Sequence, residues 1–241
     1  MKGSAFCRIA ALVLALGACS SRPDPLPGFP RLVLWAWERP ERMEFVDPQV
    51  AAVAYLARTV SWYDGRTESR PRMQPLQVRP GVRLIAVFRL QGSGPLPDAA
   101  SVADLVLRDA AQPGISALEI DFDARRSERL WYAGLLKRLR AAGLPSTMPL
   151  TMTALASWCV NDPWIRGLPV NDAVPMLFRM GAGEPRTIRN FRVGLCRSSL
   201  GVSTDELPDR LPAGKRLYVF HPRAWTEEAY RGAVVWAGRW R

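Results

Sequence analysis

Histidine, lysine and cysteine are scarce in this chain of 241 residues, which has one histidine and four cysteines. A single histidine, His221, leaves too few nitrogen ligands for the usual zinc sites built from histidine and cysteine. No glycine-rich loop follows a predicted strand, which argues against a nucleotide-binding sheet. We therefore expect neither a metal nor an organic cofactor.

Lysine occurs only at positions 2, 137 and 215, so arginine carries nearly all of the formal net charge of +11. The arginines are scattered along the chain and form no basic block. Such an excess predicts general attraction to anionic glycans, lipopolysaccharide or lipid headgroups, although arginine-rich codon usage explains it equally well. Because the chain has no recognisable nucleic-acid-binding motif, we expect no nucleic-acid partner.

The chain also has no apolar run long enough to span a bilayer. The apolar N-terminal segment Ile9–Leu16 is too short to do so. It follows a positively charged start and leads into Leu16-Gly17-Ala18-Cys19, which is the order of a secretory signal. Cysteine directly after Leu-Gly-Ala resembles the lipobox of bacterial lipoproteins. We expect residues 1–18 to be the lipoprotein signal peptide and Cys19 to carry a lipid anchor in the membrane. A simply secreted protein and an uncleaved anchor are the alternatives.

The position after Cys19 holds Ser20 and not the aspartate that resembles an inner-membrane retention signal, so we expect the periplasmic face of the outer membrane. Residues 19–30 are rich in proline and show no helical or strand pattern, which predicts a tether. Residues 31–241 contain enough hydrophobic residues for one core and show no shift in composition, so we expect a single domain. The oligomeric state has no signal in the sequence.

Cysteine usage agrees with export. Cys7 belongs to the signal peptide and Cys19 to the lipobox, so Cys159 and Cys196 remain as a pair in an oxidising compartment. We predict a disulfide between them, with two free buried thiols as the alternative. Such a bridge constrains the unfolded chain by roughly 4 kcal/mol in the loop-entropy model.

Short and almost continuously hydrophobic runs predict buried parallel strands. There are six of them: Leu32–Trp37, Val82–Phe88, Ala117–Phe122, Leu150–Ala156, Ala173–Phe178 and Arg216–Phe220. Two less regular runs, Val53–Trp62 and Val193–Val202, are further strand candidates and bring the total to eight. Helical patterns lie between them, with a helix at Ser127–Ala142, another that we expect Ser101 to cap, and a last one opened by Thr226. This alternation predicts an α/β fold, a (β/α)8 TIM-like barrel. Because the chain is shorter than the usual ~250 residues, some helices must be short or missing. An open α/β sheet is the alternative.

The run Ala117–Phe122 and the residue after it place acidic side chains at every second position. Leu118, Ile120 and Phe122 point one way, and Glu119, Asp121 and Asp123 the other. On a barrel strand the three carboxylates face inwards and step towards the C-terminal mouth, where such barrels carry their active sites. Asp121 and Asp123 are therefore candidate functional residues, unless they pair with inward arginines and cap the next helix. Glu119 lies deeper, so we expect it to be structural.

The same rule, applied to the ends of the other strands, gathers aromatic and charged residues at one mouth. Aromatic faces beside carboxylates suit a sugar, whose C–H faces stack on tryptophan while its hydroxyls bond to acids and arginine. Each tryptophan can equally be a core residue, and His221 can be a satisfied core histidine. The candidate catalytic residues are Asp121, Asp123, Glu38, Asp205 and Glu206, and the candidate substrate-binding residues are Trp35, Trp37, Trp158, Arg179 and His221.

Several segments resemble a known family: Ile120–Asp123, Thr153–Cys159, Val174–Gly181 and Ser203–Glu206. They look like the motifs of the bacterial domain-of-unknown-function family 3142, and the resemblance spans most of the mature chain. That family has no assigned reaction, so the resemblance implies little about activity.

A more distant resemblance is to family-18 glycoside hydrolases, in which a strand ends in the pattern D-x-D-x-E and the glutamate is the acid. This chain has Asp121 and Asp123 in that pattern, but Arg125 stands where the acid is expected. The resemblance therefore does not carry over the substrate-assisted mechanism, although Glu38, Asp205 or Glu206 can supply a carboxylate from another strand.

These observations support three hypotheses. The first is a glycoside-hydrolase-like enzyme that acts on a polysaccharide through Asp123 and one of Glu38, Asp205 or Glu206. The second is a lipoprotein that binds a glycan or assists envelope assembly without catalysis. The third is a structural role, which predicts a mouth plugged by side chains and Asp121 and Asp123 locked in salt bridges.

Overall fold

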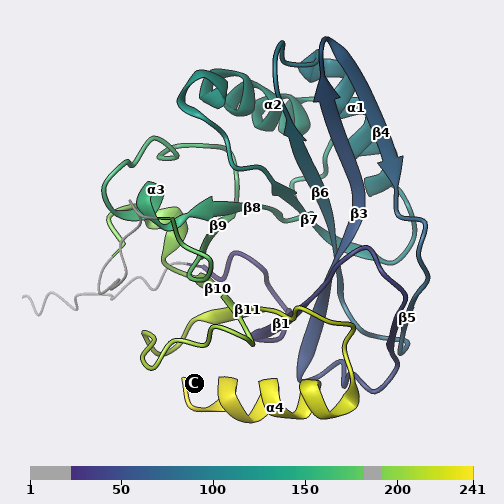
Figure 1. Cartoon of the computed structure of the whole chain (residues 1–241), viewed down its shortest axis with the longest axis vertical. Coiled ribbons are helices and arrows are strands. Elements are labelled where there is room, and N and C mark those ends of the chain that lie inside the picture. The colour runs from purple at the N-terminus through teal and green to yellow at the C-terminus, as the bar shows by residue number, and fades with distance from the viewer. Residues whose placement is uncertain (1–22, 182–190, 241) are drawn as a thin grey trace, which may run out of the picture.

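Eight parallel strands close into a barrel in the computed structural model, which describes residues 23–181 and 191–240 (Figure 1). The strands are β1 (Leu32–Ala36), β3 (Ala51–Tyr63), β6 (Leu84–Gly92), β7 (Ile115–Asp121), β8 (Leu150–Leu155), β9 (Asp172–Met176), β10 (Ser199–Ser203) and β11 (Arg216–Phe220). Each pairs in parallel with the next in the order β1-β11-β10-β9-β8-β7-β6-β3, and β1 also pairs with β3. This closure confirms the TIM-like barrel and excludes the open sheet. The predicted signal peptide and Cys19 lie outside the described residues.

Helices cover only part of the barrel. The helix α1 (Ala99–Ala110) lies between β6 and β7, and η1 (Arg126–Glu128) with α2 (Arg129–Ala141) lies between β7 and β8. The helix α3 (Ala156–Val160) and the turn η2 (Gly194–Cys196) are very short, and α4 (Glu227–Gly238) follows β11. None of the helices in the described segments is long and apolar enough to cross a membrane.

Two predicted helix caps had different outcomes. Thr226 caps α4, because its hydroxyl accepts the backbone N–H of Ala229 at 3.1 Å. Ser101 does not cap α1. The cap is Asp98, whose Oδ2 accepts the backbone N–H of Ser101 at 2.9 Å, and the helix therefore begins before Ser101.

The first two connections of the barrel contain short strands where a regular barrel has helices. Strands β2 (Glu41–Met43) and β5 (Leu76–Val78) pair in parallel as a separate small sheet, and β4 (Arg66–Pro71) pairs antiparallel with β3. Strand β1 ends at Ala36, opposite Tyr55, whereas β3 continues to Tyr63 and β6 follows it to Gly92. These long strands and β4 raise one wall of the mouth above the rest of the rim, as the blue arrows of β3 and β4 and the teal arrow of β6 show in Figure 1.

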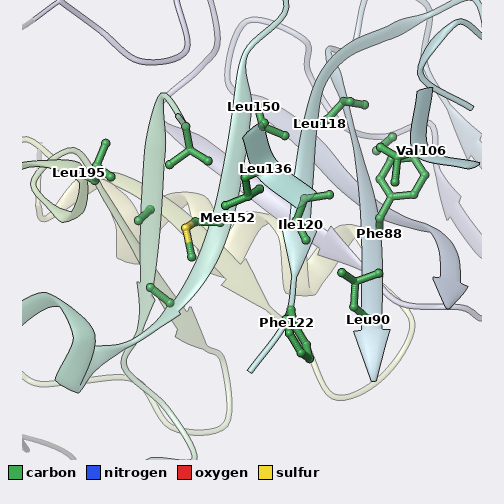
Figure 2. Packing of buried hydrophobic residues seen from close by; sticks show 14 of the residues in the cluster. Phe88, Leu90, Val106, Leu118, Ile120, Phe122, Leu136, Leu150, Met152 and Leu195 are labelled. Carbon is green, nitrogen blue, oxygen red and sulfur yellow. The ribbon is translucent and has the colours of Figure 1, made fainter. Parts of the chain in front are cut away.

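Strand alternation divides the core into two parts. Side chains that point inwards, such as Val33, Trp35, Val87 and Tyr218, fill the barrel. Side chains that point outwards pack against the helices, and Figure 2 shows Leu118, Ile120, Leu150 and Met152 of β7 and β8 near Leu136 of α2. Full burial of each such side chain stabilises the fold by about 1.5–3 kcal/mol.

The bottom of the barrel, where the strands begin, is closed by the N-terminal segment. Leu26 and Phe29 are buried and belong to the same cluster as the barrel interior. Asp24 accepts two hydrogen bonds from the guanidinium of the buried Arg216, each at 3.0 Å, and the carbonyl of Pro30 accepts a third at 3.1 Å. The packed part of the chain therefore begins before Pro30, within the stretch that we expected to be a tether.

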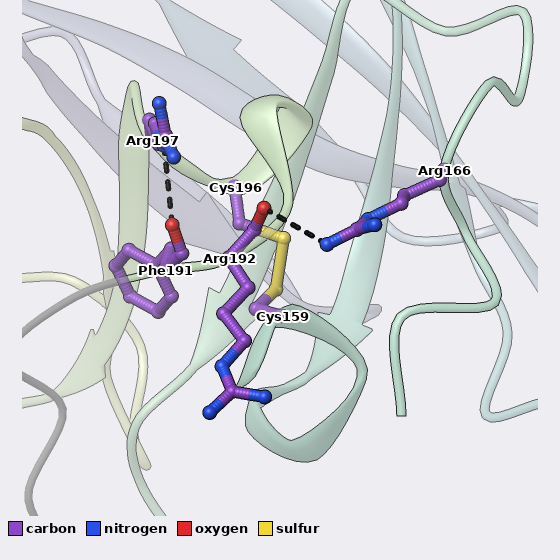
Figure 3. Close-up of a disulfide and its surroundings, with 6 residues drawn as sticks. All are labelled: Cys159, Arg166, Phe191, Arg192, Cys196 and Arg197. Atoms are coloured by element: carbon purple, nitrogen blue, oxygen red, sulfur yellow. Dashed lines mark hydrogen bonds between the residues drawn. A yellow bond between two sulfur atoms is a disulfide. The ribbon is translucent and has the colours of Figure 1, made fainter. Parts of the chain in front are cut away.

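The predicted disulfide is confirmed. Cys159 at the end of α3 and Cys196 in η2 form the bridge, with 5.8 Å between their Cα atoms. The backbone N–H of Arg192 donates to the carbonyl of Cys159 at 2.9 Å, and Figure 3 shows Arg166 donating to the carbonyl of Arg192. The bridge thus holds the segment that precedes β10 against the end of β8.

Candidate functional site

The inward-facing acids of β7 lie where their alternation predicts. Glu119 and Asp121 are buried inside the barrel, whereas Leu118 and Ile120 pack on the outside. Asp123 lies beyond the end of β7 and is exposed at the rim. One strand therefore carries acids from the middle of the barrel to its mouth, the end where barrels of this class hold their sites.

Glu119 is fully buried between neighbouring strands. Thr151 donates a hydrogen bond to its Oε2 at 2.8 Å. Burial raises the pKa of Glu119 to about 8, and the hydrogen bond from Thr151 opposes part of this rise. The negative charges of Asp121 and Asp172 push the pKa in the same direction as burial. Glu119 therefore holds its proton at neutral pH and avoids the cost of a buried charge.

Asp121 has a different environment, because it faces a cation. Arg89 lies opposite it on β6 and donates from Nη1 to its Oδ2 at 2.7 Å, and Thr153 donates to its Oδ1 at 3.0 Å. Arg89 also donates from Nε to Gln91 at 3.0 Å. The Asp121 carboxylate is therefore held by one side chain from each neighbouring strand.

Asp121 and Asp123 open into the same small hollow at the mouth. This Asp121 hollow has a volume of about 160 Å³ and is lined by Asp121, Asp123, Arg89, Gln91 and Arg125, among others. The two acids that the sequence singled out therefore share one space with solvent, and an arginine of β6 lies beside them.

A larger hollow adjoins it. The Trp37 hollow has a volume of about 470 Å³, within the usual range for small-ligand sites. It is lined by Trp37, Glu38 and Arg39 after β1, Leu56 and Thr59 of β3, Arg70 and Gln74 of β4 and the loop that follows it, and Arg89 and Gln91 of β6. Because Arg89 and Gln91 line both hollows, the two lie side by side at the mouth and together make up the candidate site.

Trp37 is held firmly in this site. Its half-buried indole ring lies 5.6 Å from the ring of Trp35 and 6.0 Å from that of Phe220. The guanidinium of Arg89 lies 5.9 Å from the ring centre of Trp37. Arg72 donates to the carbonyl of Trp37 at 2.9 Å and to that of Arg39 at 2.7 Å, which fixes the backbone after β1.

Glu38, the next residue, reaches towards the raised wall. Its Oε2 forms an ion pair with Nη2 of Arg70 at 3.0 Å, and its Oε1 accepts the backbone N–H of Met73 at 3.2 Å. These contacts connect the end of β1 to β4 and close one side of the Trp37 hollow.

Three other candidate residues gather over the ends of β9 and β10, outside the two hollows. Glu206 accepts the backbone N–H of Arg179 at 2.8 Å, and the Arg179 guanidinium lies 3.6 Å from the carboxylate of Asp205. A hydrogen bond from Ser203, followed by the influence of Arg179, lowers the pKa of Asp205. These groups bind one another and line neither of the two hollows.

His221 at the end of β11 belongs to the same side of the mouth. Its Nδ1 forms a hydrogen bond with the hydroxyl of Thr204 at 2.6 Å, and its ring lies 5.0 Å from that of Trp225. Partial burial lowers the pKa of His221, and the charges of Arg223 and Arg39 lower it further. His221 is thus a neutral ring packed on a buried tryptophan.

Two of the predicted aromatic contacts belong to the core. Trp35 is 1% exposed and stacks on Phe220 at 4.3 Å inside the barrel. Trp158 is 2% exposed and packs edge-on against Trp164 at 5.0 Å, on the outside of the strands. The helix α3 begins at Ala156 and turns Trp158 away from the mouth, so neither tryptophan lines a hollow.

Sequence reasoning missed the arginine and amide side chains of the raised wall. Arg89 and Gln91 follow Phe88, where we expected the strand to end, yet they alternate with the apolar residues Phe88 and Leu90. That alternation was the signal for a longer strand whose polar side chains face the mouth. For Arg70 the sequence has no comparable signal, because its place depends on the β3–β4 hairpin.

Comparisons with protein families, with curated proteins and with solved structures found no match to this chain. Within the described residues, no group of three or more histidine, cysteine, aspartate or glutamate side chains is arranged to hold a metal ion. The candidate site at the mouth of the barrel thus consists of an indole ring, amide groups, carboxylic acids and several arginines.

Proposed function

We propose that this protein is an envelope lipoprotein that binds a polysaccharide at the mouth of its barrel. Trp37 carries the proposal. Its ring is held by neighbouring aromatic residues and borders a hollow that also contains hydrogen-bonding side chains of Glu38, Thr59 and Gln91. Sugars bind to such sites by stacking C–H faces on the ring and by hydrogen bonds to their hydroxyls.

The anchoring part of the proposal rests on the lipobox at Cys19, and the fold supports a consistent orientation. Asp24, five residues later, is tied to Arg216 at the bottom of the barrel. Five residues span at most about 18 Å when fully extended. A lipid on Cys19 would therefore hold the bottom of the barrel near the periplasmic face of the outer membrane and leave the mouth pointing away from it.

The contacts at the mouth favour binding over hydrolysis. A glycosidase needs a carboxylic acid that can donate a proton to the leaving group and a second carboxylate across the cleft. Asp121 and Glu38 each form an ion pair with an arginine, so both carboxylates are already occupied by partners within the protein. Glu119 holds a proton but is fully buried and does not line the hollows.

Hydrolysis is the second candidate, supported by the fact that Asp121 and Asp123 share one hollow. In this candidate Asp123 acts with Asp121 or with Glu38 in the adjoining hollow. The two candidates differ in one measurable property, which is turnover.

Binding to immobilised polysaccharides and release of reducing ends test both candidates. We expect Trp37→Ala to weaken retention about tenfold, which corresponds to ~1.4 kcal/mol of binding free energy. Tyr63→Ala is the matched control, because Tyr63 is an exposed aromatic residue of β3 outside both hollows. We expect no turnover, and turnover that Asp123→Asn abolishes would overturn the binding proposal in favour of hydrolysis.

The anchor has its own test. In cells, Cys19→Ser is expected to move the protein from the membrane fraction to the soluble fraction, because the acylated thiol is lost. Wild-type protein that is soluble, with no lipid mass on its N-terminal peptide, would contradict the lipoprotein assignment and leave the carbohydrate site untouched.

A further inference from the structure

We propose that the polysaccharide bound in the Trp37 hollow is acidic and that its uronic-acid carboxylates are recognised by the arginines beside Trp37. This inference rests on the proposed function. Among the lining residues that the structure describes, Arg39, Arg70 and Arg89 carry positive charge and Glu38 carries negative charge. The hollow therefore has a formal charge of +2 next to a ring suited to a sugar face.

Arg70 is free to exchange its partner for a ligand. Its side chain is 66% exposed, whereas that of Glu38 is 12% exposed and also accepts the backbone N–H of Met73. Because the Arg70 end of the ion pair lies in solvent, which screens the attraction, a ligand carboxylate can approach Arg70 and compete with Glu38 for it.

Arg89 has N–H groups that are not used in its hydrogen bonds to Asp121 and Gln91. It uses Nη1 for Asp121 and Nε for Gln91, whereas a guanidinium carries five N–H donors. Its guanidinium and the ring of Trp37 border the same space. A sugar that contacts Trp37 therefore lies beside a planar, charged group that can bind a carboxylate through two hydrogen bonds.

The adjoining Asp121 hollow has the opposite balance. In its lining, the acidic residues Asp121, Asp123 and Glu128 outnumber the basic residues Arg89 and Arg125. This difference places the acidic group of a bound sugar in the Trp37 hollow and its hydroxyls next to the Asp121 side. Without Lys2 and Arg8 of the predicted signal peptide, the chain keeps a formal net charge of +9, which adds long-range attraction for an anionic polymer.

The test compares polymers that differ only in charge. Polygalacturonate and alginate are each measured against the same polymer after chemical reduction of its carboxyl groups. We expect the acidic forms to bind at least tenfold more tightly than the reduced forms at low salt, and the difference to shrink as salt is added.

Variants then locate the interaction. Arg70→Gln is expected to weaken binding of the acidic form about tenfold and to leave the reduced form unchanged. Glu38→Gln is expected to have the opposite effect on the acidic form, because it removes the negative charge that competes for Arg70. Arg66→Gln is the matched control, since Arg66 is an exposed arginine of the same strand β4 outside the Trp37 hollow.

Three outcomes would overturn the inference. Equal binding of acidic and reduced polymers, lost in Trp37→Ala, would leave the proposed function intact and remove only the preference for acids. An equal loss in Arg66→Gln and Arg70→Gln would reduce the effect to general charge attraction. Tighter binding of a sulfated dextran than of either uronate polymer would assign the site to sulfate. Failure of every polymer to bind would instead overturn the proposed function itself.

Discussion

Glu119 and Asp121 show how the same chemical group is accommodated in two ways on one strand. Asp121 meets Arg89 near the mouth and forms an ion pair. Glu119, one layer deeper, has the hydroxyl of Thr151 as a hydrogen-bond partner and stays protonated, because a buried charge without a cation costs several kcal/mol. The surroundings of each acid are thus set by the side chains of the neighbouring strands.

Glu119→Gln is expected to change the pH dependence of stability. In the unfolded chain Glu119 loses its proton near its ordinary pKa of 4.5, whereas in the folded protein it keeps the proton up to about pH 8. Between these values unfolding releases a proton, so the free energy of unfolding of the wild type falls as pH rises, by on the order of 1 kcal/mol per pH unit at most. Glutamine has no proton to lose, so the variant should show a flatter profile.

Urea unfolding at a series of pH values from 4 to 9 measures this effect. Glu68→Gln, at an exposed position of β4, is the control and should follow the wild-type profile. Parallel profiles for wild type and Glu119→Gln would show that Glu119 is ionised inside the barrel.

At the scale of elements, the barrel closes although several connections lack helices of useful length. The elements α3 and η2 span five and three residues, too short to be stable on their own. The bridge between Cys159 and Cys196 joins them. A covalent bond therefore holds these two connections in place, whereas packed helices do so elsewhere in the barrel.

Removal of this bridge is expected to lower the free energy of unfolding by up to about 4 kcal/mol, because the unfolded chain regains the freedom that the bridge removes. Denaturant unfolding with and without a reducing agent gives the value. A double variant with Cys159→Ser and Cys196→Ser should match the reduced wild type and no longer respond to the reducing agent. Equal stability of reduced and oxidised wild type would contradict the prediction.

The raised wall of the mouth depends on a glycine. Gly92 pairs with Trp62 at the end of β6, and any Cβ at this position would overlap the backbone and ring of Trp62. We expect Gly92→Ala to lower the free energy of unfolding by about 1–3 kcal/mol through overpacking. Gly134→Ala, inside α2 with open space around it, should raise stability by about 0.5–1 kcal/mol. Thermal unfolding of both variants checks the opposite signs.

At the scale of the whole molecule, the N-terminal segment and the mouth occupy opposite ends of one barrel. Leu26 and Phe29 close the bottom, and Trp37, only eight positions after Phe29, stands at the top of β1. A short stretch of chain therefore connects the N-terminal segment to the candidate site. Under the proposed function, this arrangement would let a lipid-anchored barrel present its hollows to a polymer on the side away from the membrane.

Leu26→Ala is expected to lower the free energy of unfolding by about 2–4 kcal/mol, because Leu26 is fully buried in the barrel interior. Leu130→Ala is the matched control, since Leu130 is 89% exposed and should change stability by less than about 0.5 kcal/mol. If the two variants unfold alike, the segment before Pro30 contributes nothing to the fold and behaves as a simple tether.

Much of the fold could be predicted from local patterns. The run Arg216–Phe220 is a strand with the bounds that its hydrophobicity indicates, and the apolar runs at 32–37 and 150–156 are strands of nearly the predicted length. The alternation around Ile120 correctly separated the acids that face inwards from the apolar residues that face the helices. Trp158 could not be placed in this way, because α3 begins at Ala156, directly after β8, and places the ring in the outer core.

The sequence by itself determined the alternating strands and helices, the inward direction of Glu119 and Asp121 and the pairing of Cys159 with Cys196. These follow from periodicity and from the number of cysteines, which are local or countable properties. Only the tertiary structure decided that Arg89 pairs with Asp121, that Arg70 reaches Glu38 and that Asp205 lies outside the two hollows. The physical reason is that a partner across a barrel is set by strand order and register, and these depend on how the whole chain packs.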